Sequence, residues 1–585
     1  MNRDPSFAGQ CRRGSALGVL ITLILVAGLI GLGAYLVMKP GSGHAPAPTS
    51  GTPTTGTSTG TASTPAVAPP AGPAVVAPEG KRPDPIEPAM AVPRLDAAAP
   101  YVPKNGILDV DISEYAGYAG LIVANKGLDP NPDSFFAKEY GFQVRLTLSE
   151  GENWSRVNHG QLAAGATTTD VLAVLGRQYA VNVPLLISYS RGADMIVVDQ
   201  GLTSVNQLAG KVLAAAQFNE SEFFIRYLAQ EAGVGVQVLR DLDARPTGKN
   251  IGLVFYADAF IAADAYQHEL ASGKNRLNGC VGWSPRTDEL VAASNGRAKI
   301  LVSNRNLLVV ADILTINQGF AQANPKMTQG LVHGILEGNR QVRADPKPFT
   351  TLLAKTLKWK EDEVPGELAK VHLANLPENL AFFNGTIDAA GSFGGIFQSA
   401  LTAYGPQLIP NPADADRFHT GTVLDALKAG GTFAQETVAI APIRTVSKGS
   451  ALEGDALLAK DIRFLFEANS STLDLASPDN QEYLATINRY LTVSPGSQVL
   501  LKGHVDNSLM AKFRQEGGET LVRNMALKAV ELSKERAKSV RQALLNKYPG
   551  MKGDRLECIG RGWEEPVSAL GDQNRRVEVR WFTLE

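Results

Sequence analysis

The chain of 585 residues has few of the residues that hold small or metal-dependent folds together. It has three cysteines, and only Cys280 and Cys558 lie beyond residue 38. Disulfide-dependent domains pack their cysteines far more densely, so a disulfide framework is excluded and stability must come from hydrophobic cores. The seven histidines are scattered, with none paired at metal-ligand spacing. We therefore expect no metal site and no cofactor.

The sequence also lacks an excess of charge and the motifs of common catalytic sites. Its net charge is -2, which provides no electrostatic footprint for nucleic acid. The glycines of GSFGGIF, residues 391–397, lack the lysine and the serine or threonine that complete a phosphate loop. No nucleophile elbow is present. We predict a protein that binds its ligands and is not an enzyme.

One long hydrophobic run is present, from residue 16 to residue 38. It carries no charge, and a helix of this length spans about 34 Å, enough to cross a bilayer. Three arginines precede it and only Lys39 follows closely, so the positive-inside rule keeps residues 1–15 in the cytoplasm. We predict an uncleaved signal anchor that crosses the inner membrane once, with cleavage as the alternative. The bulk of the chain then lies in the periplasm.

Residues 39–100 are built largely from proline, threonine, alanine, glycine and serine. Such a composition buries too little apolar surface to offset the conformational entropy of folding. We predict a disordered linker that lets a folded module work away from the membrane surface, with an idle spacer as the plain alternative.

Short apolar runs alternate with helical patterns in the predicted central domain, residues 101–446, as expected for an α/β fold. Asn219, with Glu222 three residues later, predicts the start of a helix, and Pro325 predicts the first turn of another. The strands expected from the apolar runs are residues 120–125, 184–189, 194–199, 211–216, 252–257 and 299–304.

The order of these features resembles the type II periplasmic solute-binding proteins, in the branch that includes nitrate, sulfonate and taurine receptors. The segments that carry the resemblance are YAGYAGLIVANKG (115–127), GATTTDVLA (165–173), LAGKVLAAAQFNESEFFIRYLAQEAG (208–233) and YADAFIAADAY (256–266). The resemblance implies two α/β lobes that are joined by a hinge and close around a solute.

In such a cleft, hydroxyl and amide groups at strand ends and helix amino termini bind a small polar or anionic solute. No arginine pair stands at these positions, which leaves the charge of the ligand open. Each candidate also has a plain structural alternative, such as capping a helix. By position within the pattern, the candidates are Tyr115, Tyr118, Thr168, Thr169, Asp170, Ser188, Ser190, Asn219, Ser221 and Asp258.

The last part of the chain, residues 455–585, reads as strand, helix, strand, helix and strand, a small α+β domain. It resembles the OmpA-like peptidoglycan-binding domain. The landmarks are GHVD at 503–506, LSKERA at 532–537 and NRR at 574–576. The resemblance implies that Asp506 and Arg536 bind the diaminopimelate of the stem peptide. The carboxylate of Asp506 would bind the ammonium group of the ligand, and the guanidinium of Arg536 would bind its carboxylate.

This domain departs from its family pattern at two places. Residues 510–530 read as an expanded loop after Asp506, and Ala529 stands where an asparagine is usual. Either difference weakens the expected wall site. The alternative is a retained fold in which Asp506 and Arg536 form only an exposed ion pair.

Together these features predict a two-lobed α/β domain like a periplasmic binding protein, a C-terminal α+β OmpA-like domain and one N-terminal transmembrane helix. The expected partners are peptidoglycan, the inner membrane and a small-molecule solute, with an ABC-type transporter if the protein serves uptake. Sensing is the other use of the same solute. The alternative is a structural envelope linker whose solute-binding fold serves as a protein-interaction module, and a cell-wall fragment is an alternative ligand for the cleft.

Overall fold

The computed structural model describes residues 75–149, 153–305, 307–387, 391–440, 462–493 and 497–582. The predicted cytoplasmic tail, the predicted membrane anchor and the first part of the predicted linker lie outside these residues. So does the junction between the two predicted domains. Within the described ranges, no helix has both the length and the apolar character that a membrane span requires.

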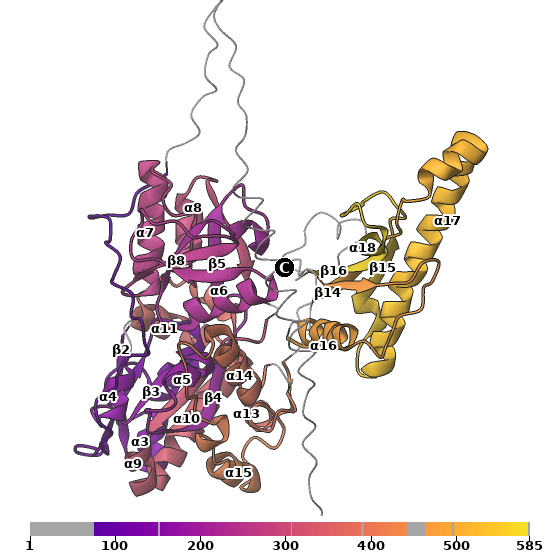
Figure 1. Ribbon diagram of the computed structural model, residues 1–585. Coiled ribbons are helices and arrows are strands. Elements are labelled where there is room, and N and C mark those ends of the chain that lie inside the picture. Colours follow the sequence, from indigo (N-terminus) through magenta and orange to yellow (C-terminus); the bar gives the residue numbers. More distant parts are fainter. Residues whose placement is uncertain are drawn as a thin grey trace, which may run out of the picture. The chain divides into compact units, whose positions relative to one another are not determined.

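The central domain is built on two six-stranded sheets (Figure 1). The first sheet has the order β12-β4-β11-β3-β1-β2 and the second has the order β10-β5-β9-β6-β8-β7. The strands of the first sheet are β1 (Ile107–Ile112), β2 (Gln143–Leu148), β3 (Ala164–Thr168), β4 (Val181–Ser190), β11 (Ala311–Asn317) and β12 (Val371–Leu373). Those of the second sheet are β5 (Asp194–Asp199), β6 (Val212–Ala216), β7 (Gly235–Val238), β8 (Asn250–Tyr256), β9 (Gly279–Trp283) and β10 (Ala298–Ser303).

The middle strands of both sheets are covered on both faces, which is why they read as unbroken apolar runs. Every residue of β6, β9 and β11 is buried. A parallel or mixed sheet with helices on both faces favours such runs. The sequence therefore located β5, β6, β8 and β10 to within two residues and β4 to within three.

The strand expected at residues 120–125 is wrong, because this segment forms helix α2 (Ala119–Asn125). All seven of its residues are buried, so its sequence is apolar on every side and carries no helical period. Helix α10 (Pro325–Ala344) approaches it so closely that a Cβ on Gly338 would lie 1.9 Å from the carbonyl oxygen of Gly120. The run is a fully buried helix and not a strand.

The predicted helix starts are confirmed. The Asn219 side chain caps α6 by accepting the main-chain N–H groups of Ser221 and Glu222, and Pro325 begins α10. The helices in or beside the first sheet are α2, α3 (Phe135–Tyr140), α4 (Trp154–Asn158), α5 (Thr169–Leu175), α9 (Gln318–Ala323), α10, α11 (Thr350–Leu357), α12 (Val364–Leu368), α13 (Leu376–Phe383), α14 (Phe393–Tyr404) and α15 (Thr422–Ala429). Those of the second lobe are α6 (Glu220–Glu231), α7 (Ala259–Ser272) and α8 (Arg286–Ala293). Short 3-10 turns are η1 (Ala116–Tyr118), η2 (Val205–Leu208), η3 (Lys347–Phe349) and η4 (Ala415–Arg417).

The chain passes twice from one sheet to the other, so each sheet with its helices forms a lobe. The first crossing joins β4 to β5 through residues 191–193, and the second joins β10 to β11 through residues 304–310. Asn304 connects the two crossings, because its side-chain oxygen accepts the Gly192 N–H at 2.8 Å and its amide donates to Asp194 at 3.1 Å. Crossings tied in this way form the hinge expected of a two-lobed binding protein.

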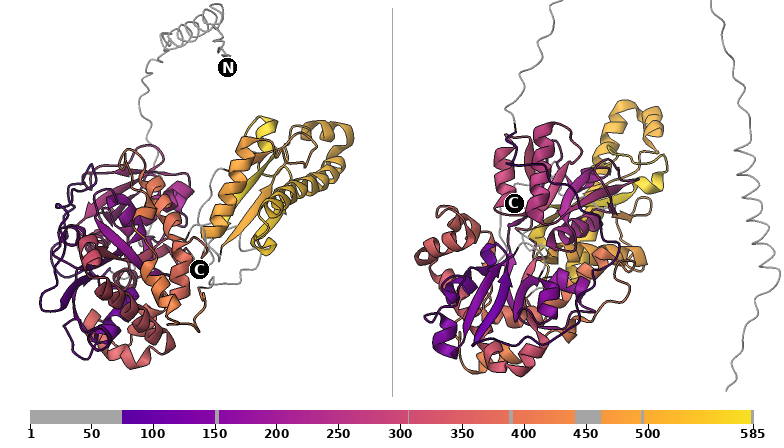
Figure 2. Two further views of the ribbon diagram at one scale, coloured as in Figure 1. Left: turned by 90° about the horizontal axis from the view of Figure 1, so that it is seen from below. Right: turned by 90° about the vertical axis from the view of Figure 1, so that its left-hand side faces the viewer.

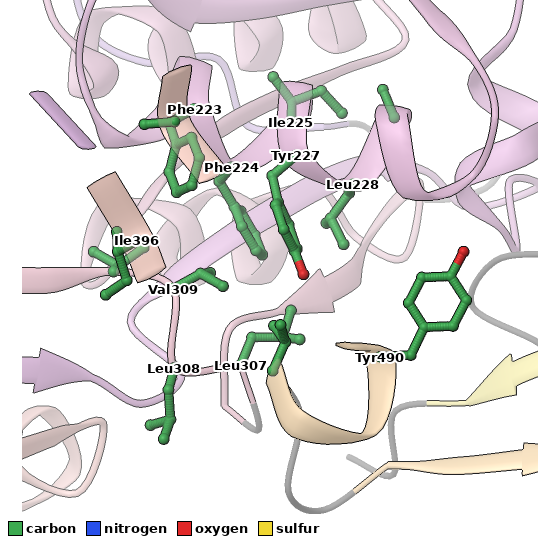
Figure 3. Close-up of a cluster of buried hydrophobic side chains, with 14 of the residues drawn as sticks. Phe223, Phe224, Ile225, Tyr227, Leu228, Leu307, Leu308, Val309, Ile396 and Tyr490 are labelled. Atoms are coloured by element: carbon green, nitrogen blue, oxygen red, sulfur yellow. The ribbon is translucent and has the colours of Figure 1, made fainter. Parts of the chain in front are cut away.

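A hydrophobic cluster lies beside the second crossing (Figure 3). Phe223 and Phe224 of α6 belong to the same buried cluster as Ile396 of α14 and the crossing residues Leu308 and Val309. Helix α14 contacts both α6 in the second lobe and α5 in the first. The glycine-rich segment at residues 391–397, which lacks the residues of a phosphate loop, therefore forms the start of a helix that packs on both lobes.

An extended segment, residues 75–103, lies along both lobes, and we call it the strap. Its first part is held by the second lobe, where the Ile86 N–H donates to Phe255 and the Gln217 side chain bonds both main-chain groups of Ala89. Its later part is held by the first lobe, through Gln178 and Asn317. The predicted linker extended to residue 100, whereas residues 75–100 are placed by these side-chain bonds, which composition does not reveal.

The C-terminal domain has a four-stranded sheet in the order β13-β16-β14-β15, with α16 and α17 packed against it (Figure 2). Strand β14 pairs in parallel with β15 and antiparallel with β16. Its elements are β13 (Arg463–Leu465), α16 (Pro478–Val493), β14 (Gln498–Gly503), α17 (Met510–Lys547), η6 (Gly553–Arg555), β15 (Leu556–Gly560), α18 (Gly571–Asn574) and β16 (Arg576–Phe582). The predicted strands and helices are present, and the structure adds strand β15 and the short helix α18, which the predicted succession lacked.

The expanded loop expected at residues 510–530 is instead helical. Helix α17 already begins at Met510, and its helical geometry is broken only at Gly517 and Gly518. Gly518 has a φ of 62°, a conformation that glycine adopts without strain. The extra residues thus form a helical arm with a glycine kink.

Candidate functional site

A cleft lies where the two sheets face each other, with about 650 Å³ of free space including its open mouth. Its position between two lobes is a usual place for a small-molecule site. The residues that line it are Ser113, Tyr115, Tyr118, Ser149, Asn153, Ala166, Thr167, Thr168, Asp194, Asn219, Glu220, Trp283, Val310 and Asp312. They come from both lobes, so closure of the hinge changes the shape of the cleft.

The fold places these side chains at strand ends. In the first sheet, β1 runs parallel to β2 and β3, so the segments that follow these strands meet at one edge. In the second sheet, the start of β5, the end of β9 and the amino terminus of α6 face the same space. Loop groups at the carboxyl ends of parallel strands are the usual ligand contacts of open α/β sheets.

Three buried aspartates dominate the chemistry of the cleft. Asp194 and Asp312 line it and are 4% and 3% exposed, while Asp170, at the start of α5, is fully buried. Burial raises the pKa of Asp194 to about 6, that of Asp170 to about 7 and that of Asp312 to about 8. These three carboxyls therefore titrate near neutral pH.

Hydroxyl and amide groups hold two of the three carboxyls. Asp312 accepts hydrogen bonds from the Ser188 hydroxyl at 2.8 Å and the Tyr118 hydroxyl at 3.2 Å. Asp194 accepts from the hinge residue Asn304. Both oxygens of Asp170 lack a partner in hydrogen-bonding geometry within the described part of the chain. None of these contacts brings a positive charge into the cleft.

Three further polar groups in the wall of the cleft have no partner in hydrogen-bonding geometry among the described residues. They are the Tyr115 hydroxyl, the Thr168 hydroxyl and the Trp283 indole N–H, each on a side chain at least nine-tenths buried. Burial of an unpaired polar group costs about 1–3 kcal/mol. Such groups are expected where a ligand or ordered water completes the bonding.

The lobes also meet beside the cleft through Lys370. This lysine precedes β12 in the first lobe, and its ammonium group donates to Asp288 of α8 at 2.6 Å and to the Ser284 hydroxyl, both in the second lobe. Glu367, from its own lobe, also binds the ammonium, at 2.8 Å. Ser284 directly follows Trp283, so this contact fixes the lobes relative to each other next to the cleft wall.

The structure places four of the ten solute-site candidates in the lining of the cleft. Tyr115, Tyr118, Thr168 and Asn219 line the cleft. Five others are buried but are not among the lining residues: Ser188, which donates to Asp312, and Thr169, Asp170, Ser190 and Ser221. Asp258 is not among the lining residues and caps α7 by accepting the Ile261 N–H at 2.7 Å.

The sequence analysis missed Asp194, Asp312 and Trp283. An available signal was that Asp194 and Asp312 open two strongly apolar runs, DMIVVD and DILTIN, where a charged residue needs a reason. Trp283 gave no such signal, because only the topology of the second sheet brings the end of β9 to the cleft. Within the described residues, no group of histidine, cysteine, aspartate and glutamate is arranged to hold a metal ion.

In the C-terminal domain, Asp506 follows β14 and pairs with Arg575 at 3.4 Å. Partial burial opposes the shift, but hydrogen bonds from Ser508 and the charge of Arg575 hold the pKa of Asp506 below its ordinary value. The side chain is 15% exposed, so it remains reachable from solvent. Asp506 and Arg575 therefore form a partly exposed ion pair.

Arg536 has a different environment. It is fully buried, and its guanidinium donates to three main-chain carbonyls, those of Glu467, Ser470 and His504, at 2.8–2.9 Å. Burial, followed by the nearby charge of Arg575, lowers the pKa of Arg536 to about 10. Arg536 thus ties the turn after β13 to the segment that carries Asp506, and the ion pair of Asp506 is with Arg575.

Comparison with known proteins gives one family match and several similar structures. Residues 465–580 match the model of the OmpA family. No curated protein matches the chain. Solved structures similar to the chain include the alkanesulfonate-binding protein SsuA from Xanthomonas axonopodis pv. citri bound to MOPS, with 13% identity over 55% of this chain and 99% of that one and a TM-score of 0.42.

The periplasmic aliphatic sulphonate-binding protein SsuA from Escherichia coli is also similar, with 14% identity, 59% and 97% coverage and a TM-score of 0.40. The desulfurization enzyme DSZB is similar to the same extent, with 13% identity, 55% and 99% coverage and a TM-score of 0.38. The chain thus joins a two-lobed α/β domain to a C-terminal domain that matches the OmpA family model.

Proposed function

We propose that the chain is an envelope receptor that binds a small polar solute between its two lobes and attaches to peptidoglycan through its OmpA domain. The observation that carries the first half is the cleft itself. Residues of both lobes line it, and three of its buried polar groups have no partner in hydrogen-bonding geometry within the described structure. A cleft that served only as packing would have been filled by side chains.

The second half rests on the OmpA match and on the partly open carboxylate of Asp506. The ammonium group of a diaminopimelate stem peptide suits this carboxylate. Arg575 stands beside it, and Arg536 supports the backbone around it, so both arginines contribute to the wall site in this proposal. An anchor at residues 16–38 and a flexible linker would fix the receptor to the inner membrane, for uptake or sensing.

Native mass spectrometry of the full chain, purified gently from a bacterial envelope, tests the receptor. The expected result is a discrete mass increment that disappears on denaturation. A chain that carries no small molecule and stays unshifted with panels of anions, amines, amino acids and muropeptides would contradict it. That result would favour the structural linker, in which the two-lobed domain is an interaction module.

Wall attachment is tested separately, by sedimentation of the full chain with purified peptidoglycan sacculi. The chain is expected to pellet with sacculi and to be released by free diaminopimelate. Failure to pellet would refute wall attachment without affecting the solute cleft, because the cleft and the OmpA site share no residue.

A further inference from the structure

The charge of the cleft distinguishes between classes of solute. Its lining contains Asp194, Asp312 and Glu220, and the buried Asp170 is close enough to Asp194 and Asp312 to interact with their charges. Among the described residues that line the cleft, there is no lysine, arginine or histidine. A buried carboxylate is costly unless a positive charge or a proton compensates it. The cleft therefore disfavours an anionic solute.

Buried carboxylates elsewhere in the chain show how this protein compensates such groups. Glu222 binds Arg226, Glu269 binds both Arg82 and Arg276, and the nearest contacts are 2.6–2.8 Å. No such partner is found within the described residues for Asp170, Asp194 or Asp312, whose bonds come from neutral groups. Within the described structure, the three buried aspartates at the cleft therefore have no ion-pair partner.

Aromatic side chains form part of the same wall. Tyr115 and Tyr118 pack edge to face with their ring centres 5.5 Å apart, and Trp283 lies on the opposite lobe. The faces of such rings attract a cation, most strongly when water is excluded. The unpaired indole N–H of Trp283 additionally needs a hydrogen-bond acceptor.

We propose that the solute is a small organic cation, with an ammonium group held between Asp194 and Asp312 and a hydrogen-bond acceptor that reaches Trp283. This inference rests on the proposed receptor function and names the chemical class of its ligand. The cation supplies the positive charge that the lining lacks. Tyr115 and Tyr118 lie beside it on the side of the first lobe.

Binding of a cation to these carboxyls releases protons. Burial raises their pKa values to about 6, 7 and 8, so part of the population is protonated in the empty cleft near neutral pH. Affinity is therefore expected to fall as pH drops through this range. The titratable groups that face the aspartates are Glu220 on α6, Tyr115 and Tyr118 near η1, and Tyr404 on α14.

The test uses the full chain and isothermal titration calorimetry at pH 8 with ethanolamine, choline and putrescine as cations. Ethanesulfonate and acetate serve as anions, and ethylene glycol as a neutral probe of similar size. The expected result is binding of at least one cation, with weaker affinity at pH 5.5. Asp312→Asn should weaken that binding about tenfold or more, while the exposed control Asp362→Asn leaves it unchanged.

If none of the probes binds, the proposal is tested by identifying the small molecule that co-purifies with the full chain. A released solute that carries an amine or quaternary ammonium supports the proposal, and a solute without a cationic group overturns it. Binding of the anions in preference to the cations also overturns it, although the chain would remain a receptor. A chain that binds none of the probes and carries no solute refutes the receptor function itself.

Discussion

The contact made by Lys370 predicts how firmly the lobes are held together. Lys370→Met keeps the aliphatic stem but removes the ammonium that reaches Asp288 and Ser284 across the lobes. The lysine side chain is 25% exposed and that of Asp288 is 38% exposed, so solvent screens the pair. An ion pair of this kind contributes about 1 kcal/mol at most. We expect the closed arrangement, in which this contact is made, to lose roughly that amount of stability relative to the open arrangement.

A loss of about 1 kcal/mol lowers the ratio of closed to open molecules about fivefold. Solute affinity, measured by calorimetry with the co-purified ligand or the best amine probe, should weaken by up to the same factor. In the unliganded full chain, hydrogen exchange should speed up in peptides that cover residues 188–194 and 280–288. The first of these contains Arg191, whose N–H donates to the carbonyl of Lys370.

Lys360→Met is the matched control. Lys360 forms a comparable ion pair with Glu363 at 2.6 Å, but both residues belong to one turn of the first lobe. This control should leave both affinity and exchange unchanged. If Lys370→Met behaves like Lys360→Met in both measurements, the reasoning that this contact holds the lobes together is refuted.

Three other predictions follow from contacts described above. Asp506→Ala should abolish sedimentation with sacculi while the melting temperature stays within a few degrees, whereas Arg536→Ala should also unfold the domain, because three carbonyls lose their donor. Asp170 has a pKa of about 7 in the folded chain, against an ordinary value of about 3.9. The folded chain therefore binds this proton more tightly than the unfolded chain, and the empty protein should lose stability as pH rises from about 4 to 8. Asp170→Asn should raise the melting temperature at pH 8 but not at pH 4. Gly338→Ala should cost about 2 kcal/mol in urea denaturation, because its Cβ would collide with the carbonyl of Gly120.

Each of these has a result that would count against it. Normal sedimentation of Asp506→Ala would remove Asp506 from the wall site, and a fully folded Arg536→Ala would remove its supporting role. A gain for Asp170→Asn that is equal at both pH values would show that folding does not raise the pKa of its carboxyl. Gly366→Ala, where a Cβ meets nothing within 4 Å, is the control for Gly338→Ala and should not destabilise.

The sequence was sufficient where local chemistry determines the structure. Strand β5 was located to the residue, because an apolar run bounded by aspartates suits a buried strand. The cap of α6 by Asn219 followed from the residue type and the position of Glu222. Polar residues at strand ends, such as Tyr118 and Thr168, reached the cleft because parallel strands end at one edge.

The sequence was insufficient where distant segments decide. Residues 120–125 form a helix because α10 covers them, and no pattern within the segment reports that. Asp312 is separated from Asp194 by more than a hundred residues, and only the second crossing brings them to one cleft. Arg536 matched a family position, but its three carbonyl partners depend on how the turn after β13 folds back.

The strap sets a limit on how far the two lobes can part. Its last anchor on the second lobe is Ala89, bonded to Gln217, and its first on the other lobe is Pro93, whose carbonyl accepts from Gln178. The four residue steps between these anchors span about 14 Å when fully extended. On this side of the molecule, the distance between the two anchor points therefore cannot exceed the extended length of this segment. Any wider opening of the lobes must first break the hydrogen bonds of Gln217 or Gln178 to the strap.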